Sequence, residues 1–235
     1  MSAPPLLLGL LLLWGTIVGL DVVTFPQSMV SRPLVAGAIT GILVGAVQPD
    51  LFPIPPVMTG LLVGAVLELY ALDVLPVGAS RYPDYGPATV AGTYAALGWR
   101  PEVGLGASVG VGLVIAVLGG WAMQVVRRAN AAAIQRRAAA LSAGESDAIR
   151  ALQWGGIRRD IGRSAGVTLT GLMLAEIVWP LLPPGSDNFR WLTVVAVGGG
   201  IAAALGGAIR SAGRTLRLVW LIGGLCLGIL VIGLR

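Results

Sequence analysis

Long apolar runs separated by proline-rich breaks constrain the fold of this chain more than any other feature. A helix needs roughly 20 apolar residues to cross the hydrocarbon core of a bilayer, and about five of the runs approach this length. Hydrophobic residues make up 56% of the 235 residues and charged residues only 11%, a balance that excludes an ordinary soluble domain. The sequence therefore predicts an all-α membrane protein, a polytopic helical bundle that forms a single membrane domain over residues 1–235. The apolar runs are 5–20, 33–47, 57–72, 86–98, 103–126, 165–183, 191–209 and 217–234.

Three runs in the N-terminal half, which begin at residues 33, 57 and 86, are short for a bilayer span. Proline-rich breaks at 48–56 and 76–87 separate them, and a regular helix cannot continue through such segments. Short interrupted segments at membrane depth are tolerated where protein encloses them or where they line a polar cavity. We therefore predict broken or re-entrant helices here, with a functional site within residues 27–90. Ordinary short helices joined by external loops are the alternative.

The distribution of arginine predicts the orientation. All 16 basic residues are arginine, and eight of them lie between Arg127 and Arg163. Because short cytoplasmic loops are enriched in basic residues, we expect residues 127–164 to form a cytoplasmic basic loop between N-terminal spans (1–126) and C-terminal spans (165–235). Within it, residues 127–140 are rich in alanine and favour an interfacial or partner-facing helix. Topology thus explains the positive charge, and we expect no nucleic-acid partner.

Histidine is absent, and cysteine occurs once, at Cys226. These absences exclude phosphohistidine chemistry, disulfides within the chain and multi-thiolate metal sites. The sequence contains no phosphate-binding loop, dinucleotide fingerprint or nucleophile elbow. We therefore expect no catalytic residue, no metal and no cofactor, and any phosphoryl transfer has to take place on a partner protein. The first apolar run lacks a basic segment and a cleavage site, so we expect a retained span rather than a signal peptide.

Acidic residues within or beside apolar runs are the main candidates for a functional role, since charge is costly in a membrane. Glu68 is the strongest, because a carboxylate there can accept hydrogen bonds from sugar hydroxyls; a structural bond to a helix terminus or to an arginine is the alternative. In either case we expect a polar or cationic partner. Asp73 and Asp84 lie at break boundaries, where exposure to solvent is plausible, and Glu176 reads as an interfacial residue.

Three further polar residues lie just before the second apolar run. Arg32 precedes Pro33 and is placed to pair with Glu68 or Asp21, or to mark a membrane edge. Gln27 and Ser28 are uncharged groups of the kind that orient a sugar, and they are equally common in turns. We include Arg32, Gln27 and Ser28 among the candidate substrate-binding residues.

The segments Ser31–Gly37 and Thr59–Leu72, followed by Gly78-Ala79, Pro83-Asp84 and the stretch 126–140, resemble the membrane IIC subunit of the mannose and sorbose family of sugar phosphotransferase systems. The resemblance covers roughly residues 20–165. It implies that Glu68 is the family's glutamate of a broken helix and that Asp84 is the acidic residue of the next hairpin. It also implies a multi-pass location in the bacterial cytoplasmic (inner) membrane.

In that family the IIC subunit pairs with a membrane IID subunit to carry a hexose-like sugar inward. Soluble IIA and IIB subunits pass phosphate from phosphoenolpyruvate through histidines, which fits a chain without histidine. The resemblance thus implies a sugar permease, not an enzyme by itself, in a homo-oligomer of IIC–IID units. Together with the residues singled out above, the candidate substrate-binding residues are Glu68, Asp73, Asp84, Arg32, Gln27 and Ser28. Met29, Ser31, Ala46, Asp73 and Pro76 depart from the family pattern. The alternative is a diverged sensor, regulatory or structural membrane protein that keeps this fold.

Overall fold

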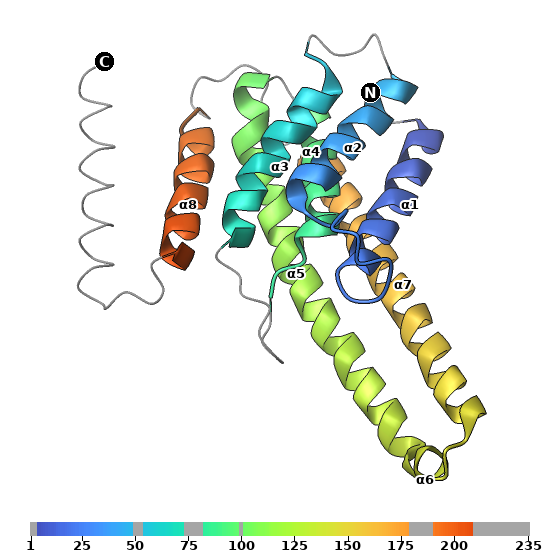
Figure 1. Ribbon diagram of the computed structural model, residues 1–235. Coiled ribbons are helices and arrows are strands. Elements are labelled where there is room, and N and C mark those ends of the chain that lie inside the picture. The colour runs from blue at the N-terminus through green and yellow to red at the C-terminus, as the bar shows by residue number, and fades with distance from the viewer. Residues whose placement is uncertain (1–3, 49–53, 73–81, 99–100, 179–189, 209–235) are drawn as a thin grey trace, which may run out of the picture.

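The computed structural model describes residues 4–48, 54–72, 82–98, 101–178 and 190–208, and these residues form helices joined by turns and short loops (Figure 1). Two helices, at 104–136 and 146–178, are long and apolar enough to cross a membrane, and four shorter apolar helices accompany them. The predicted all-α helical fold is confirmed; Asp73 and Cys226 lie outside the described residues. The helices are α1 (Pro5–Asp21), α2 (Pro33–Val47), α3 (Pro56–Leu72), α4 (Tyr85–Gly98), α5 (Pro101–Arg136), α6 (Ala138–Ser142), α7 (Ser146–Val178) and α8 (Arg190–Ala208).

Proline sets where several of these helices begin. Pro5, Pro33, Pro56 and Pro101 are the first residues of α1, α2, α3 and α5. At the first position of a helix the missing N–H costs nothing, and the fixed φ of proline already suits the helix. The breaks predicted from proline therefore coincide with helix starts, and they leave α1 to α4 short.

Helices α2 and α3 form a hairpin whose two backbones touch. A Cβ atom added at Gly37 would collide with the carbonyl oxygen of Gly60, and one added at Gly60 would collide with the carbonyl oxygen of Gly37. A Cβ at Gly41 would likewise collide with the carbonyl oxygen of Pro56, and one at Gly64 would lie 2.5 Å from the carbonyl oxygen of Pro33. Small residues permit such an approach between helices in a membrane. These glycines therefore form the packing faces of α2 and α3.

Helix α4 lies at the centre of the bundle. Its residues from Gly86 to Leu97 are all buried, and it packs against α1, α2, α3, α5 and α7. Its 14 residues span only about 21 Å at 1.5 Å per residue. A helix too short to cross the bilayer is thus enclosed by protein on every side, as the interrupted N-terminal sequence predicts.

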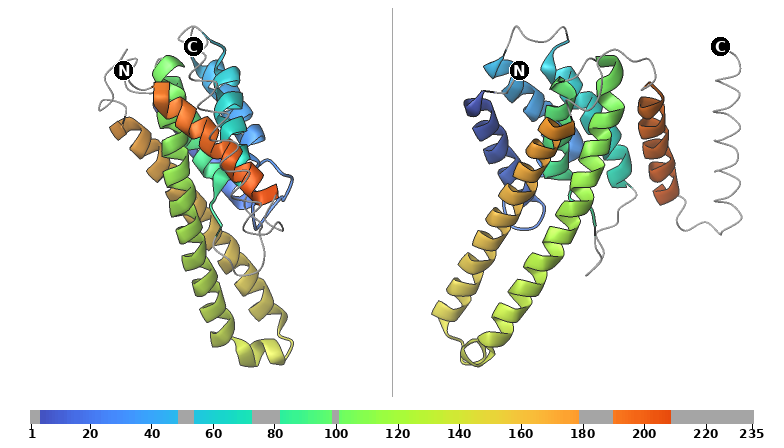
Figure 2. Two further views of the ribbon diagram at one scale, coloured as in Figure 1. Left: turned by 90° about the vertical axis from the view of Figure 1, so that its left-hand side faces the viewer. Right: turned by 180° about the vertical axis from the view of Figure 1, so that it is seen from behind.

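Helices α5 and α7 continue well beyond the other helices and form a protruding hairpin, closed by α6 (Figures 1 and 2). We call residues 127–159 the arm. The segment that we expected to be a loop is therefore almost entirely helical, as its alanine content favours. Arg159 Nη1 donates a hydrogen bond to Asn130 Oδ1 at 2.7 Å and joins the two helices of the arm. Within α7, Asp160 and Arg163 are already buried against the bundle, so the part of the helix that packs there begins before residue 165.

Candidate functional site

Polar and charged side chains gather where α1 ends and where α2 and α4 begin. The loop between α1 and α2, residues 22–32, is shaped by Asp21, which is buried at the end of α1. Its carboxylate accepts hydrogen bonds from the backbone N–H of Ser28 at 2.6 Å and of Ser31 at 2.9 Å, and from the Ser28 hydroxyl at 3.1 Å. One buried carboxylate thus holds the loop in a defined shape.

The α1–α2 loop displays polar groups to the outside. Gln27 and Met29 have positive φ values of 57° and 65°, which side-chain-bearing residues adopt only when their surroundings impose it. The Gln27 side chain is exposed and donates a hydrogen bond to the Val23 carbonyl at 3.0 Å, and Ser28 is also exposed. The predicted candidates Gln27 and Ser28 therefore lie side by side on an ordered, accessible loop.

Two further candidates, Arg32 and Glu68, form an ion pair at the end of this loop, which we call the open pair. Arg32 Nη2 lies 3.0 Å from Glu68 Oε1, and the two side chains are 52% and 19% exposed. Glu68 Oε2 also accepts a hydrogen bond of 3.3 Å from the backbone N–H of Leu34, in the first turn of α2. A carboxylate is favourable at a helix N-terminus. The prediction that Glu68 has a cationic partner is confirmed, and both bonds that we considered as its structural role are present.

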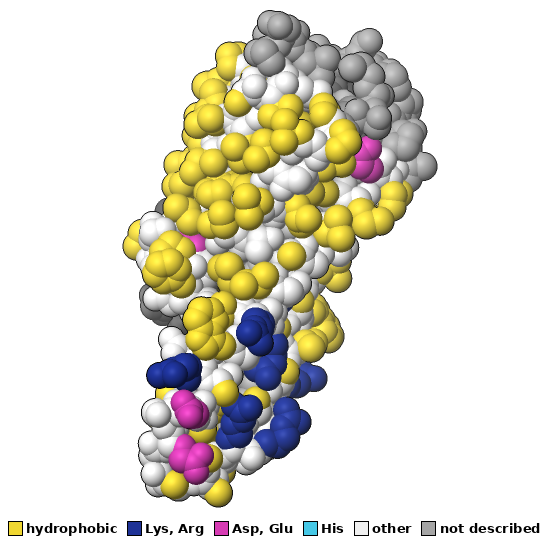
Figure 3. All heavy atoms as spheres, turned by 90° about the vertical axis from the view of Figure 1, so that its right-hand side faces the viewer, with side chains coloured by type: hydrophobic (Ala, Val, Ile, Leu, Met, Phe, Trp, Pro, Cys, Tyr) yellow, Lys and Arg dark blue, Asp and Glu magenta, His cyan; other side chains and the backbone are white. Residues whose placement is uncertain are grey.

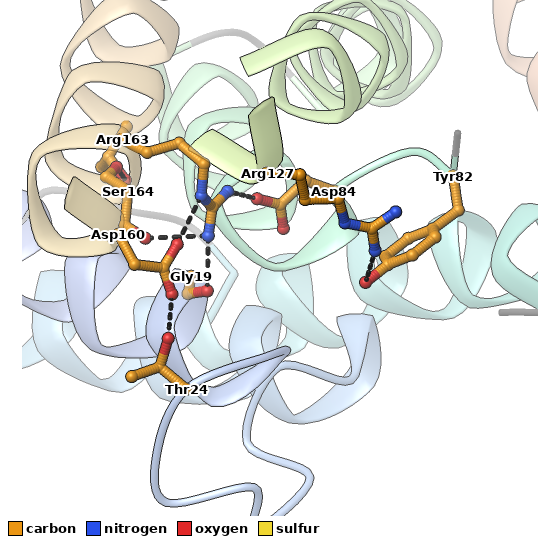
Figure 4. Close-up of polar contacts among 9 residues, drawn as sticks. Gly19, Thr24, Tyr82, Asp84, Arg127, Asp160, Arg163 and Ser164 are labelled. Carbon is orange, nitrogen blue, oxygen red and sulfur yellow. Dashed lines mark hydrogen bonds and ion pairs between the residues drawn. The ribbon is translucent and has the colours of Figure 1, made fainter. Parts of the chain in front are cut away.

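A second arginine–carboxylate cluster lies deeper, and we call it the buried group (Figure 4). Arg163 of α7 is ion-paired with Asp84, just before α4, and with Asp160 at 2.7 Å. Its remaining N–H groups donate to the carbonyl oxygen of Gly19 at 2.8 Å and to the Ser164 hydroxyl at 3.0 Å. One guanidinium therefore joins α1, α4 and α7.

Asp84 is enclosed rather than accessible. Its side chain is 1% exposed, its backbone N–H bonds to the Ala116 carbonyl of α5 at 2.9 Å, and a Cβ on Gly119 would collide with it. The exposure that we considered plausible for Asp84 is wrong, because α5 closes over it. The Oδ1 atom of Asp84 has no hydrogen-bond partner among the described residues. In this conformation Asp84 contributes to the scaffold behind the loop and not to an open surface.

The α1–α2 loop connects the two clusters. The Thr24 hydroxyl donates a hydrogen bond to Asp160 Oδ2 (Figure 4). Arg32, at the end of the same loop, is ion-paired with Glu68. Sequence reasoning missed Asp160 and Arg163, because their charge was attributed to the cytoplasmic segment. The spacing of three residues between them, just before an apolar run, is the signal that was available.

Glu176 lies away from this region, near the end of α7. It accepts a hydrogen bond from the Tyr94 hydroxyl of α4. It also lines an apolar cavity of about 330 Å³ between α1 and α7, together with Leu8, Leu12, Met173 and neighbouring residues. No group of three or more His, Cys, Asp or Glu within the described residues is arranged to hold a metal ion.

Comparison with known families identifies the chain. The model of the family described as the PTS system sorbose-specific IIC component matches residues 6–212. The chain belongs to this family. As a IIC component of the mannose and sorbose class it is a membrane component of a sugar phosphotransferase system, and the resemblance found in the sequence is confirmed.

Curated relatives of this IIC component include the mannose-specific EIIC components of Escherichia coli K12 and Shigella flexneri. Each is 27% identical over 123 residues, which cover 52% of this chain and 41% of the relative. The aligned region thus spans less than half the length of the curated relatives.

Two solved structures share the fold. One is described as a membrane protein and has a TM-score of 0.70 at 18% identity, covering 99% of this chain and 92% of its own. The other is the mannose transporter ManYZ in complex with microcin E492, with a TM-score of 0.58 at 21% identity, covering 100% and 89%. Both agree with the IIC fold over nearly the whole length.

Proposed function

We propose that this IIC component binds a hexose-like sugar beside the open pair and translocates it as the permease subunit of a mannose/sorbose-type phosphotransferase system. The observation that carries the proposal is the partly accessible pair of Arg32 and Glu68, which lies at the end of the same loop that exposes Gln27 and Ser28. These residues come from two separate segments of the chain, the α1–α2 loop and α3, and they meet where the short helix α2 begins. In transporters such interrupted helices build the substrate site.

The chemistry of the four side chains suits a sugar. A carboxylate accepts hydrogen bonds from hydroxyl groups, a guanidinium donates up to five, and an amide does both. Hydrogen bonds to ionised groups are stronger than those between neutral groups. Half of the Arg32 side chain is accessible, so its guanidinium has donors to spare beyond the bond to Glu68. Asp84 supports this site from behind through Arg163. Asp73, which lies outside the described residues, joins the proposal as the acidic residue that ends the apolar run 57–72.

Membership of the family supports the remaining parts of the proposal. The chain would act with a membrane IID subunit, and phosphorylation would take place on a soluble IIB subunit supplied by IIA, so that this chain is not an enzyme by itself. The sugar-specific names of its relatives support a sugar as substrate. We place the protein in the bacterial inner membrane, with the arginine-rich arm on the cytoplasmic side.

Uptake of radiolabelled hexoses and amino sugars tests the proposal, in cells that express the chain with its IID and IIB proteins. We expect sugar phosphate to accumulate only when all three are present, and Glu68→Gln to abolish it. Glu145→Gln makes the same chemical change at an exposed turn before α7 and serves as the matched control. Uptake that survives Glu68→Gln would move the sugar site elsewhere. The absence of uptake for every sugar, with the protein correctly inserted, would favour a diverged sensor or structural role.

A further inference from the structure

The outer surface of the arm carries an unusual stripe on α7. Arg150, Trp154 and Arg158 follow one another at intervals of four residues, so they lie on one face of the helix. All three are exposed; the Arg150 side chain is 72% exposed and Trp154 is 56% exposed. Arginine and tryptophan are the residues most enriched in the energetic centres of protein interfaces. An exposed tryptophan between two arginines is therefore a candidate binding surface.

The charge of the arm selects the kind of partner. The arm holds seven arginines and only two acidic residues, Glu145 and Asp147. Figure 3 shows basic side chains gathered on this protruding part, whereas hydrophobic side chains cover the bundle above it. The exposed Ile134 and Ile149, at 52% and 54%, add apolar surface to the arm. Such a surface is complementary to an acidic one that has an apolar pocket for the tryptophan.

The direction and length of α7 indicate whether the stripe contacts a protein or the lipid surface. Helix α7 runs without interruption from the arm into the bundle, so the arm cannot lie flat on the membrane (Figure 2). Arg150 and Arg158 are separated by eight residues, or about 12 Å along the helix. The headgroup layer of one leaflet is only about 5 to 7 Å deep. The stripe therefore extends beyond the headgroups into water, where a protein can reach it.

We propose that the Arg150–Trp154–Arg158 stripe is the docking surface for an acidic cytoplasmic protein. This inference rests on the proposed function, which names IIB as the soluble phosphocarrier of this chain, and it requires an acidic surface on IIB. The same helix carries Asp160 and Arg163, which hold the α1–α2 loop and α4. Docking on the stripe would thus bring the phosphocarrier within about 20 Å, along one helix, of the residues that support the sugar site.

Binding of purified IIB protein to the full chain in lipid nanodiscs tests the proposal. The double variant Arg150→Glu/Arg158→Glu should weaken binding at least about tenfold, as should Trp154→Ala, because residues at an interface centre contribute most of the affinity. Arg136→Glu/Arg137→Glu makes the same change of charge at the end of α5 and is the matched control. We expect it to reduce affinity only about two- to threefold, through weaker long-range attraction.

Several outcomes would overturn the proposal. Equal weakening by the two double variants would show that the arm attracts partners through its total charge and not through the stripe. Unchanged binding in the stripe variants would place the docking surface elsewhere. If the stripe variants alter only the response of the protein to phosphatidylglycerol, the stripe is a lipid contact. Sugar binding by the chain with IID, measured without IIB, tests the proposed function separately, so the failure of one proposal is distinguishable from the failure of the other.

Discussion

The open pair and the buried group use the same chemistry at the same end of the bundle, and they differ in their surroundings. In the open pair, Arg32 is 52% exposed and meets a single carboxylate, that of Glu68. In the buried group, Arg163 is 1% exposed and meets two carboxylates, a backbone carbonyl and a hydroxyl. The first guanidinium has donors left for a ligand, and the second uses four of its five N–H donors within the protein.

This difference assigns separate roles to the two clusters. An exposed ion pair contributes only about 0.2 to 1 kcal/mol to stability. Removing one partner of a buried pair costs about 3 to 5 kcal/mol, because an uncompensated charge remains in the interior. The buried group therefore holds the helices together, whereas the open pair can give up its bonds at little cost to the fold, as the proposed sugar binding requires.

The largest effect is expected for Arg163→Ala. The variant leaves Asp84 and Asp160 buried without their cation, and we expect it to lose about 3 to 5 kcal/mol of stability. The melting temperature of the purified protein in detergent measures this loss. Arg128→Ala, at an exposed position on α5, is the control.

Because Arg163→Ala risks failing to fold, Arg163→Lys provides a second variant, which keeps the charge and loses the fork of donors. It should melt between the wild type and the alanine variant. Equal melting temperatures for Arg163→Ala and Arg128→Ala would remove the distinction between the two clusters.

A smaller effect is expected where the α1–α2 loop joins the buried group. Thr24→Val removes the hydroxyl that donates to Asp160 while it preserves the shape of the side chain. A hydrogen bond to a charged group contributes about 1.5 to 3 kcal/mol. We expect a lower melting temperature, together with a higher sugar concentration for half-maximal uptake, because the loop that presents Gln27 loosens. Thr24→Ser keeps the hydroxyl and should restore both values; if it fails to do so, the methyl packing and not the hydrogen bond is what matters.

The sequence predicts the helices well because their causes are local. Proline marks the starts of α1, α2, α3 and α5, and apolar length separates the short helices from α5 and α7. The arm was harder to predict. Its arginines indicate a cytoplasmic segment, and only its alanine content indicates that the segment is helical. Charge reports the side of the membrane on which a segment lies and does not report its secondary structure.

The site was predictable only in part, and for a physical reason. Glu68 stands out because a lone carboxylate within an apolar run requires a partner, and Arg32 is the nearest cation before that hairpin. The burial of Asp84 depends on α5 and α7, which are distant in sequence, so its local context at a proline break pointed toward solvent. Asp21 and Arg163 likewise gain their roles from tertiary contacts that no local pattern encodes.

A further test concerns what holds the open pair in place. Gly60→Ala inserts a Cβ against the Gly37 carbonyl and forces α2 and α3 apart. Overpacking of this kind costs about 1 to 3 kcal/mol, and it should separate Arg32 from Glu68 and so reduce sugar uptake. Gly45→Ala on the same hairpin is the control, since its Cβ would meet the Pro56 ring at an ordinary 3.6 Å. If both variants behave alike in melting temperature and uptake, the backbone contact does not position the pair.

The smallest effect on stability, and the sharpest test of the comparison, is expected for Arg32→Ala. The side chain is half exposed, so its removal should cost only about 0.2 to 1 kcal/mol and should barely change the melting temperature. Sugar uptake should nevertheless be lost, because the guanidinium donors that the proposed site offers beside Glu68 are gone. Arg32→Lys keeps one charge without the planar fork and should recover uptake only in part. A large fall in melting temperature, with uptake preserved in the protein that remains folded, would reverse the roles of the two clusters. The open pair would then be the one that stabilises the fold.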